Sequence, residues 1–393
     1  MHTGRTSARA PQVTGIEPRD VAVRDVSPRE AEQWRALASI ASDPNPFSDP
    51  DFLIPSVSTH PQARDARLLT VWRGDNLIAV MPYARAERRI GPLRLRTASS
   101  SASFSAFEGE RFHPLIAPGE AHAAVQGLLR GARSLGCAAL EFGRIRTGSE
   151  LHHAIEAARE RGVAVLREAE RSFVRAGRQT IGADATEGPF PTQHLSTSAR
   201  KRLRRMAGAI AKHGPLTLHD DSALPRAVDA FLELQNAGWK GDADADGKAF
   251  VRTGLDAWFR SVCESFRDHD KLVLLSLRAG DDVVFTTVAL RSGRGAFGFH
   301  DAYATEFRAF SPGALGRLAE IRAVLRLPDI DFFDPSMDDS KYPQVTGLYP
   351  DDEGFSTFLM ATRISSGLAI RLAPLARAVK ARVSRPRERA DSP

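Results

Sequence analysis

The chain has 393 residues, of which 42% are hydrophobic and 26% are charged, and this composition excludes wholesale disorder and a fibrous repeat. At about 100 to 200 residues per domain, the length predicts two domains. The net charge is +6, but residues 363–393 carry eight basic and two acidic residues, so the rest of the chain is neutral. We therefore expect no nucleic-acid partner.

The first twenty residues lack the apolar core of a signal peptide, and no uninterrupted apolar run approaches the length of about 18 residues that a spanning helix needs. We therefore expect a cytoplasmic protein. Cys137 and Cys263 lie far apart, each inside an apolar pattern, which indicates buried, reduced thiols. Two cysteines exclude a cysteine-based zinc or iron site, and we expect no metal.

Apolar runs of period two alternate with helical patterns, which indicates a mixed α/β chain. We expect a disordered segment over residues 1–19 and then an N-terminal lobe over residues 20–173. Its predicted strands cover residues 21–26, 67–72, 77–84, 93–97, 138–142 and 163–167, and its predicted helices cover residues 30–41, 51–59, 121–134 and 152–161. Residues 174–194 hold three Gly and two Pro without periodicity, which is typical of a linker.

The pattern then restarts, and it predicts a C-terminal lobe over residues 195–362. Its predicted helices cover residues 197–212, 224–237, 248–267 and 312–327, and its predicted strands cover residues 216–219, 272–278, 283–291, 296–303 and 330–333. The runs LLTVWRGDNLIAVMPYA and LLSLRAGDDVVFTTVAL place the same strand, Gly-Asp turn and strand in both halves. This correspondence predicts a tandem duplication of one module.

Residues 363–393 are predicted to form a basic amphipathic helix over 364–383 and a disordered tail. This composition suits peripheral contact with the inner face of an anionic membrane about as well as it suits packing on the protein body. Pro374 interrupts the helix in either case.

The start of the predicted helix 312–327 is a candidate anion site. Ser311 is expected at the N-cap and Pro312 at the first helical position, and Gly313 lets a ligand approach the backbone. The same three residues also make a good helix start without any ligand. Both interpretations stay open.

Several segments together resemble the GNAT-type acyltransferases, and more closely the CelD/BcsL-like family of acetyltransferases associated with cellulose and exopolysaccharide biosynthesis. They are LSTSARKRLRRMAGAIAKHG at 195–214, ELQNAGWKG at 233–241, the run ending in Ser-Pro-Gly at Gly313, DFFDPSMDDSKY at 331–342 and, more weakly, PNPFSDPDFL at 44–53. The resemblance covers about residues 195–345.

The resemblance implies an α/β fold of tandem GNAT-like lobes, each a mixed, mostly antiparallel sheet flanked by helices. It also implies acetyl-CoA or another acyl-CoA as co-substrate. Acyl transfer needs a base, oxyanion donors and an acid for the thiolate. The candidate catalytic residues are His300, Asp301, Tyr303, Asp334 and Lys341. The candidate acyl-CoA contacts are Arg308, Phe310, Ser311, Gly313, Ala314 and Leu315, and the candidate acceptor contacts are Trp239, Lys240, Arg204 and Tyr342.

We therefore expect an N- or O-acyltransferase that acts on a sugar or glycan precursor in exopolysaccharide or cell-envelope biosynthesis. A Fem-type aminoacyl or peptidyl transferase and a non-catalytic scaffold of a polysaccharide assembly remain alternatives. Ala304 stands where relatives often have Asp, which keeps the scaffold open. The basic run 200–205 stacks like charges on one helix, which fits an anionic ligand or a solvated face.

Overall fold

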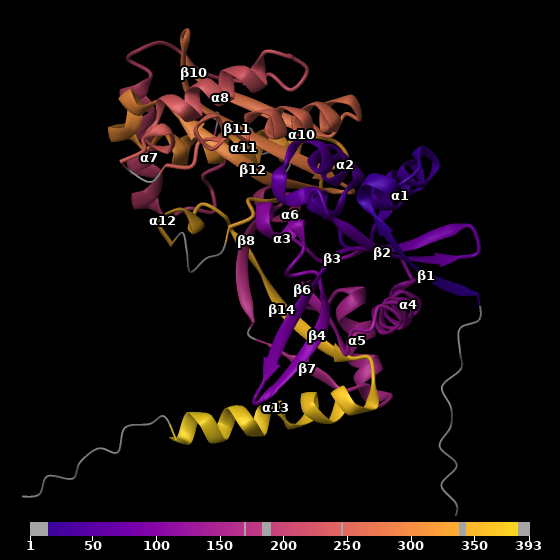
Figure 1. The fold of residues 1–393 in the computed structure, drawn as a ribbon. Helices are drawn as coiled ribbons and strands as arrows, with labels where there is room; N and C mark the ends of the chain where they lie inside the picture. The colour runs from indigo at the N-terminus through magenta and orange to yellow at the C-terminus, as the bar shows by residue number, and fades with distance from the viewer. Residues whose placement is uncertain (1–14, 169, 183–189, 245–246, 338–342, 384–393) are drawn as a thin grey trace, which may run out of the picture.

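A computed structural model describes residues 15–168, 170–182, 190–244, 247–337 and 343–383 (Figure 1). In these residues fourteen strands form one sheet, which runs through both halves of the chain in the order β1-β2-β3-β4-β6-β14-β8-β13-β12-β11-β10-β9, with β5 beside β3 and β7 beside β14. Strand pairs are antiparallel except β4 with β6 and β12 with β13. The parallel pair of β12 with β13 forms one wall of the candidate site.

The first half contains seven of the described strands and five α-helices, whose order follows the predicted pattern. They are β1 (Ile16–Ala22), α1 (Pro28–Ile40), α2 (Pro50–Thr59), β2 (Arg67–Arg73), β3 (Asn76–Ile90), β4 (Leu93–Ser99), α3 (Phe104–Glu108), β5 (Leu115–Ile116), α4 (Ala121–Ser134), β6 (Ala139–Arg146), α5 (Glu150–Glu160) and β7 (Val165–Arg167). The helix prediction over 121–134 is confirmed residue for residue.

The second half is built the same way. Its elements are β8 (Arg171–Gly177), α6 (Arg178–Ile181), α7 (Thr197–Ile210), β9 (Leu216–Asp220), α8 (Ala227–Ala237), α9 (Phe250–Thr253), α10 (Asp256–Asp268), β10 (Leu272–Ala279), β11 (Asp282–Ser292), β12 (Gly295–Tyr303), α11 (Pro312–Arg326), β13 (Phe332–Asp334), α12 (Pro343–Thr346), β14 (Asp351–Ala361) and α13 (Ile364–Val383). The hairpins β2–β3 and β10–β11 each carry a register shift near their Gly-Asp turn.

Some element predictions are wrong. The strand predicted over 21–26 is β1, which ends at Ala22 before a 3₁₀ turn over Val23–Asp25. The long helix predicted over 248–267 is broken at Gly254, whose φ of 72° is left-handed and ends α9. The strand predicted over 330–333 is β13, Phe332–Asp334.

One strand from the end of the second half completes the sheet of the first half. β14 comes near the end of the chain, but it pairs with β6 and β7 of the first half as well as with β8, and Figure 1 shows it running from the second half into the first. β8 also pairs with β13. Part of the predicted linker is regular structure, since residues 174–177 form the end of β8 and residues 178–181 form α6. The division into lobes at 20–173 and 195–362 stays a prediction.

A hydrophobic core also joins the halves. Phe47, Phe52 and Phe104 of the first half pack with Trp258 and Phe259 of α10 in one buried cluster. The Trp258 Nε1 donates to the Ser56 Oγ at 2.8 Å, so the largest side chain of this interface keeps a hydrogen bond inside the core. Cys263 lies in the same cluster and Cys137 is also buried, and both are free thiols, as predicted.

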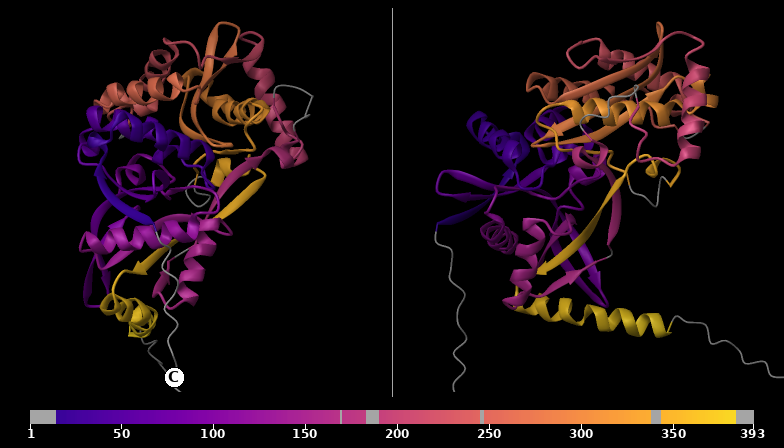
Figure 2. Two further views of the ribbon diagram at one scale, coloured as in Figure 1. Left: turned by 90° about the vertical axis from the view of Figure 1, so that its right-hand side faces the viewer. Right: turned by 180° about the vertical axis from the view of Figure 1, so that it is seen from behind.

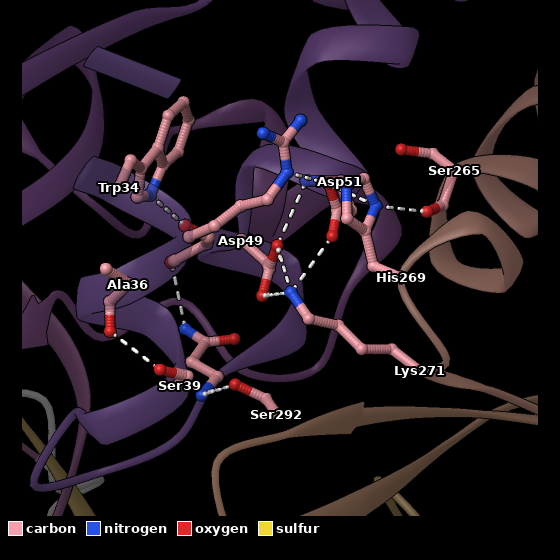
Figure 3. Close-up of polar contacts among 12 residues, drawn as sticks. Trp34, Ala36, Ser39, Asp49, Asp51, Ser265, His269, Lys271 and Ser292 are labelled. Carbon is pink, nitrogen blue, oxygen red and sulfur yellow. Dashed lines mark hydrogen bonds and ion pairs between the residues drawn. The ribbon is translucent and has the colours of Figure 1, made fainter. Parts of the chain in front are cut away.

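A buried ion-pair cluster lies beside this core (Figure 3). The Lys271 Nζ at the start of β10 lies 3.0 Å from the Asp49 Oδ2 and 2.9 Å from the Asp51 Oδ2. The Arg35 Nε lies 2.8 Å from the Asp51 Oδ1, and the His269 Nδ1 lies 3.3 Å from the same oxygen. Burial raises the pKa of Asp49 to about 6 although Lys271 opposes the rise. The cluster fixes α2 against the second half.

A second buried ion pair ties the two halves at the end of β13. The Arg111 Nε and Nη2 each donate at 2.9 Å to a different carboxylate oxygen of Asp334. The guanidinium carbon lies 4.1 Å from the ring centroid of Phe173 and 4.7 Å from that of Phe355. The side chains of Arg111 and Asp334 are 1% and 6% exposed, so neither charge has water as an alternative partner.

We predict that Arg111→Met lowers the free energy of unfolding by about 3 to 5 kcal/mol, because it leaves the Asp334 carboxylate buried without its cation. Urea denaturation of the full chain measures the loss. The double variant Arg111→Met with Asp334→Asn should recover much of it, since no uncompensated charge remains. Equal losses in the single and double variants would show that the charge pair is not the cause.

Candidate active site

The candidate site begins where two parallel strands separate. β12 and β13 are in register from Gly295 opposite Phe332 to Phe297 opposite Asp334. Beyond this point β12 continues to Tyr303, while the segment that follows β13 turns at Ser336, whose φ is 58°. The Ser336 backbone N–H donates to the Asp334 Oδ1 at 2.7 Å, which stabilises the turn. Among the described residues, the last part of β12 therefore has no strand on this side.

The open edge of β12 presents backbone hydrogen-bonding groups. The Ala304 N–H donates to the Val284 carbonyl on β11 at 3.1 Å. Because hydrogen-bonded and non-hydrogen-bonded pairs alternate in an antiparallel ladder, the backbone groups of Asp301 and Tyr303 point away from β11. The Lys240 Nζ lies 2.7 Å from the Asp301 carbonyl oxygen, as this alternation requires.

A cavity of about 400 Å³ lies at this separation and takes its walls from both halves. Its lining residues are Phe47, Glu108, Glu110, Trp239, Lys240, Thr287, Gly298, Phe299, His300, Asp301, Arg317, Glu320, Phe333, Pro335, Ser336, Met337 and Tyr349. A second cavity of about 370 Å³ shares Trp239, Lys240, Asp301 and Arg317 with it and reaches Tyr303 and Arg308. The two cavities together follow the open edge of β12.

Asp301 is held by two cations. Its carboxylate pairs with Arg317 of α11, and its Oδ1 lies 3.6 Å from the Lys240 Nζ. Burial alone would raise the pKa of Asp301, but the positive charges of Arg317 and Lys240 outweigh burial and lower the pKa. This pairing disfavours Asp301 as the base and makes it the anchor for two cations on the cavity wall.

His300 is unsuited to hold a proton at neutral pH. Burial, and then the charge of Lys240, lower the pKa of His300 to about 3. The ring packs edge-on against Phe250 with centroids 4.6 Å apart. His300 lines the cavity as a neutral imidazole, so its predicted role as the base is disfavoured.

The start of α11 differs in detail from its prediction. Ser311 stands at the N-cap, but its φ is 51° and its side chain makes no capping hydrogen bond. Its carbonyl instead accepts from the Ala314 N–H at 3.1 Å. A Cβ added at Gly313 would meet only the Arg317 Nη1, at 3.8 Å, so the space beside this residue is open.

The other predicted residues are divided between the cavities and the rest of the fold. Trp239 and Lys240 line both cavities, and Tyr303 and Arg308 line the second. Asp334 is bound to Arg111 and lines neither cavity. The residues that also line neither cavity are Phe310, Ser311, Gly313, Ala314, Leu315 and Arg204. Lys341 and Tyr342 lie outside the described residues.

Sequence reasoning missed three carboxyl groups that line the first cavity, those of Glu320, Glu108 and Glu110. Glu320 of α11 is 3% exposed, and its Oε1 accepts from the Thr287 Oγ1 at 2.8 Å. Burial raises the pKa of Glu320 to about 8. It is the one acidic residue in the sequence of α11, among three arginines, and that isolation was the available signal.

The second missed carboxyl comes from the first half. Glu108, at the end of α3, has a side chain 13% exposed, with its Oε1 3.2 Å from the His60 Nε2. Burial raises the pKa of Glu108 to about 7 and lowers the pKa of His60. Nothing in the local sequence marks Glu108, because the cavity that it faces is built by strands far away in the chain.

The matched family model identifies the part of the chain that builds β12, β13 and α11. Residues 197–342 match the model described as "Acetyltransferase (GNAT) domain". The segment is a GNAT acetyltransferase domain. The match supports an acyltransferase, and GNAT domains use acyl-CoA as co-substrate. The match is to the GNAT domain in general, so the narrower CelD/BcsL-like family stays a prediction. No curated protein matches the chain.

Solved structures resemble the whole fold at low sequence identity. The C-terminal domain of a putative lysylphosphatidylglycerol synthetase from Agrobacterium fabrum has a TM-score of 0.51 and 12% identity, over 88% of this chain and 96% of that one. FemX has a TM-score of 0.49 and 10% identity, over 82% and 95%. A tandem GNAT protein from the clavulanic acid biosynthesis pathway has a TM-score of 0.42 and 14% identity, over 88% and 99%. The predicted α/β fold, a mixed and mostly antiparallel sheet flanked by helices, is confirmed.

Two searches of the described residues bear on ligands and membranes. No group of three or more His, Cys, Asp or Glu there could hold a metal ion. Within the same residues, no helix combines the length and the apolar character needed to cross a membrane.

We predict that Glu320→Gln removes a pH-dependent loss of stability. The folded-state pKa of about 8 lies above the ordinary value of 4.5 for a glutamate, so between these values the unfolded chain ionises while the folded one stays protonated, and stability falls as pH rises. The variant should be more stable relative to the wild type at pH 8 than at pH 5, by on the order of 3 kcal/mol. Urea denaturation at both pH values measures this difference. A difference that does not change with pH would contradict the raised pKa.

Proposed function

We propose that the chain transfers an acyl group from acyl-CoA to an amine or hydroxyl of an acceptor that binds between the two halves. The observation that carries this proposal is the cavity at the separation of β12 and β13, which places Glu108 of the first half opposite the open edge of the GNAT domain. A carboxyl group with a pKa near 7 suits general base catalysis at neutral pH.

The open edge of β12 fits the donor. An extended chain that carries amide groups can pair with the backbone groups of Asp301 and Tyr303 that point away from β11, as an added strand would, with Lys240 giving up its contact to the Asp301 carbonyl. At the end of this edge, α11 is 15 residues long, and the positive end of its dipole favours a diphosphate at Gly313. Arg308 lines the adjoining second cavity and adds a cation there.

The transfer step needs three kinds of group. Glu108 would accept the proton of the acceptor as its nitrogen or oxygen attacks the thioester carbonyl carbon. Lys240 and Arg317 would lower the energy of the negative charge that develops on the carbonyl oxygen. As the carbon–sulfur bond breaks, the thiolate would take a proton from Tyr303, whose position in the second cavity places it along the same edge.

We propose a sugar or glycan precursor as the acceptor, in exopolysaccharide or cell-envelope biosynthesis. The sequence resemblance to the CelD/BcsL-like family supports this class. Trp239 lies at the wall of both cavities with 52% of its surface exposed, and an exposed indole offers a flat apolar face with a polar N–H. Such a face suits the apolar side of a sugar ring.

A Fem-type aminoacyl or peptidyl transferase is the second candidate. Lys201, Arg202, Arg204 and Arg205 are exposed on α7 of the GNAT domain, and this basic face would suit a charged tRNA. This candidate predicts binding of aminoacyl-tRNA without stabilisation by acyl-CoA, while a scaffold predicts neither.

We predict that acetyl-CoA or a longer acyl-CoA raises the melting temperature by several degrees, and that Gly313→Trp abolishes this shift because the indole fills the open space at the start of α11. Thermal melts with and without each ligand measure the shift. Gly208→Trp is the matched control, since Gly208 is an exposed helical glycine of α7 with nothing near its added Cβ. No shift in the wild type with any acyl-CoA would overturn the proposed donor.

We predict that Glu108→Gln lowers kcat/KM by about 100-fold to 10,000-fold, since it removes the proton acceptor, and leaves the acyl-CoA melting shift unchanged. In the wild type kcat/KM should rise with pH through about 7, where the carboxylate forms, and the variant should lose this rise. Glu110→Gln serves as the control, because Glu110 lines the same cavity but is paired with Arg144. Full activity in Glu108→Gln would exclude Glu108 as the base.

A further inference from the structure

The end of the molecule formed by α13 carries exposed aliphatic side chains. α13 lies across the end opposite β9 and β10, and its second part extends past the body (Figures 1 and 2). Ile364, Leu368 and Leu372 are 97%, 64% and 49% exposed. Their spacing of four residues puts them on one side of the helix, while Ile370 and Ala373 are buried against the sheet. One side of α13 therefore packs on the protein and another presents an apolar stripe to solvent.

Five arginines from four segments gather beside the start of this stripe. Arg130 and Arg133 of α4 and Arg363, which precedes α13, line one shallow depression. Arg96 of β4 lies near Arg363, because the Ala138 N–H donates to the Arg96 carbonyl at 2.7 Å and the Thr362 N–H donates to the Ala138 carbonyl at 3.1 Å. Arg85 lies on the paired strand β3, and the charges of Arg85, Arg96 and Arg363 all act on the Cys137 thiol. We call these five arginines with Ile364 and Leu368 the basic end.

Within the described part of the chain, none of the five arginines of the basic end forms an ion pair, and Arg130 donates only to the Ile16 carbonyl, at 3.2 Å. Glu87 of β3 stands opposite Arg96 in the β3–β4 ladder, but its ion pair, at 3.7 Å, is with Arg94. Like charges held together raise the free energy of the fold unless an anion lies near, so this surface is complementary to an anionic partner.

We propose that the basic end docks the protein on an anionic phospholipid surface, with the arginines on the lipid phosphates and Ile364 and Leu368 inserted among the headgroups. Basic residues next to exposed aliphatic ones are the combination that interfacial helices use. The positive charge and the exposed aliphatic surface meet at one place, because Arg363 and Ile364 are adjacent in the chain and Ile364 is almost fully exposed.

A lipid surface explains the basic end better than a nucleic acid does. Single-stranded nucleic acids bind to basic surfaces that also carry aromatic rings for base stacking, and the exposed apolar residues of this end are aliphatic. Docking through this end is independent of the proposed chemistry. It uses none of the residues that line the cavities between the halves.

The test is co-sedimentation of the full chain with vesicles of phosphatidylcholine alone and of phosphatidylcholine with roughly one-third phosphatidylglycerol, a content chosen to give a clearly negative surface. We expect binding to the anionic vesicles only, and weaker binding at high salt because salt screens exposed charges. The double variant Arg133→Glu with Arg363→Glu should lower the partition coefficient by at least about twentyfold, since each arginine near such a surface contributes about fivefold.

The matched control is Arg202→Glu with Arg205→Glu on α7, which makes the same change in net charge on exposed residues of the other half. This control separates the position of the charge from the net charge of the protein. If binding depends on the basic end, the control should alter vesicle binding by less than about twofold. Ile364→Ser with Leu368→Ser should weaken binding even at high salt, because it removes the apolar contribution. Unchanged melting temperatures would show that each variant is folded.

Three outcomes would overturn the proposal. One is absence of binding to anionic vesicles, and another is equal loss in the α7 control. The third is binding of transfer RNA that depends on Arg133 and Arg363 while the vesicles stay unbound. Since none of these measurements uses acyl transfer, failure of the docking proposal would leave the proposed function untouched.

Discussion

The ion pair between Arg111 and Asp334 is the constraint on which the candidate site depends. It fixes the last residue of β13, and the same carboxylate accepts the Ser336 N–H that turns the chain away. Among the described residues, β12 has no partner on this side beyond Phe297, so its backbone groups there face the cavity instead of another strand. If the chain after Asp334 had continued as a strand beside β12, it would have covered this edge. A residue from the other half therefore binds the last residue of β13, at the point where the chain turns away from β12.

The candidate site therefore belongs to both halves. The GNAT domain supplies β12, β13, α11 and the cations on Asp301, while the first half supplies Arg111 and Glu108. The aromatic core around Trp258 and the Lys271 cluster hold these parts together. In this arrangement the first half contributes residues to the site of the second half, and it need not bind a donor of its own.

The sequence predicted what depends on local periodicity. Helices such as α4 and α13 and the two Gly-Asp hairpins follow from apolar spacing and turn residues, and their positions are confirmed. The predicted interruption at Pro374 is wrong, because α13 continues through this residue to Val383. β14 was not predicted, because its centre is buried on both faces and loses the alternation of a half-buried strand. Glu108, Glu320 and Arg111 were also missed. Their pKa values or ion pairs arise from burial among elements distant in sequence, and no local pattern records that burial.

The position of β14 in the sheet has a consequence for how the chain is made. β6 in the first half needs β14 as its neighbour, yet a ribosome must synthesise more than two hundred further residues before that strand emerges. Until then β6 has an unpaired edge, which is a site for association with other chains. The first half therefore cannot complete its sheet during synthesis, and a chain that stops before residue 351 leaves it permanently unfinished.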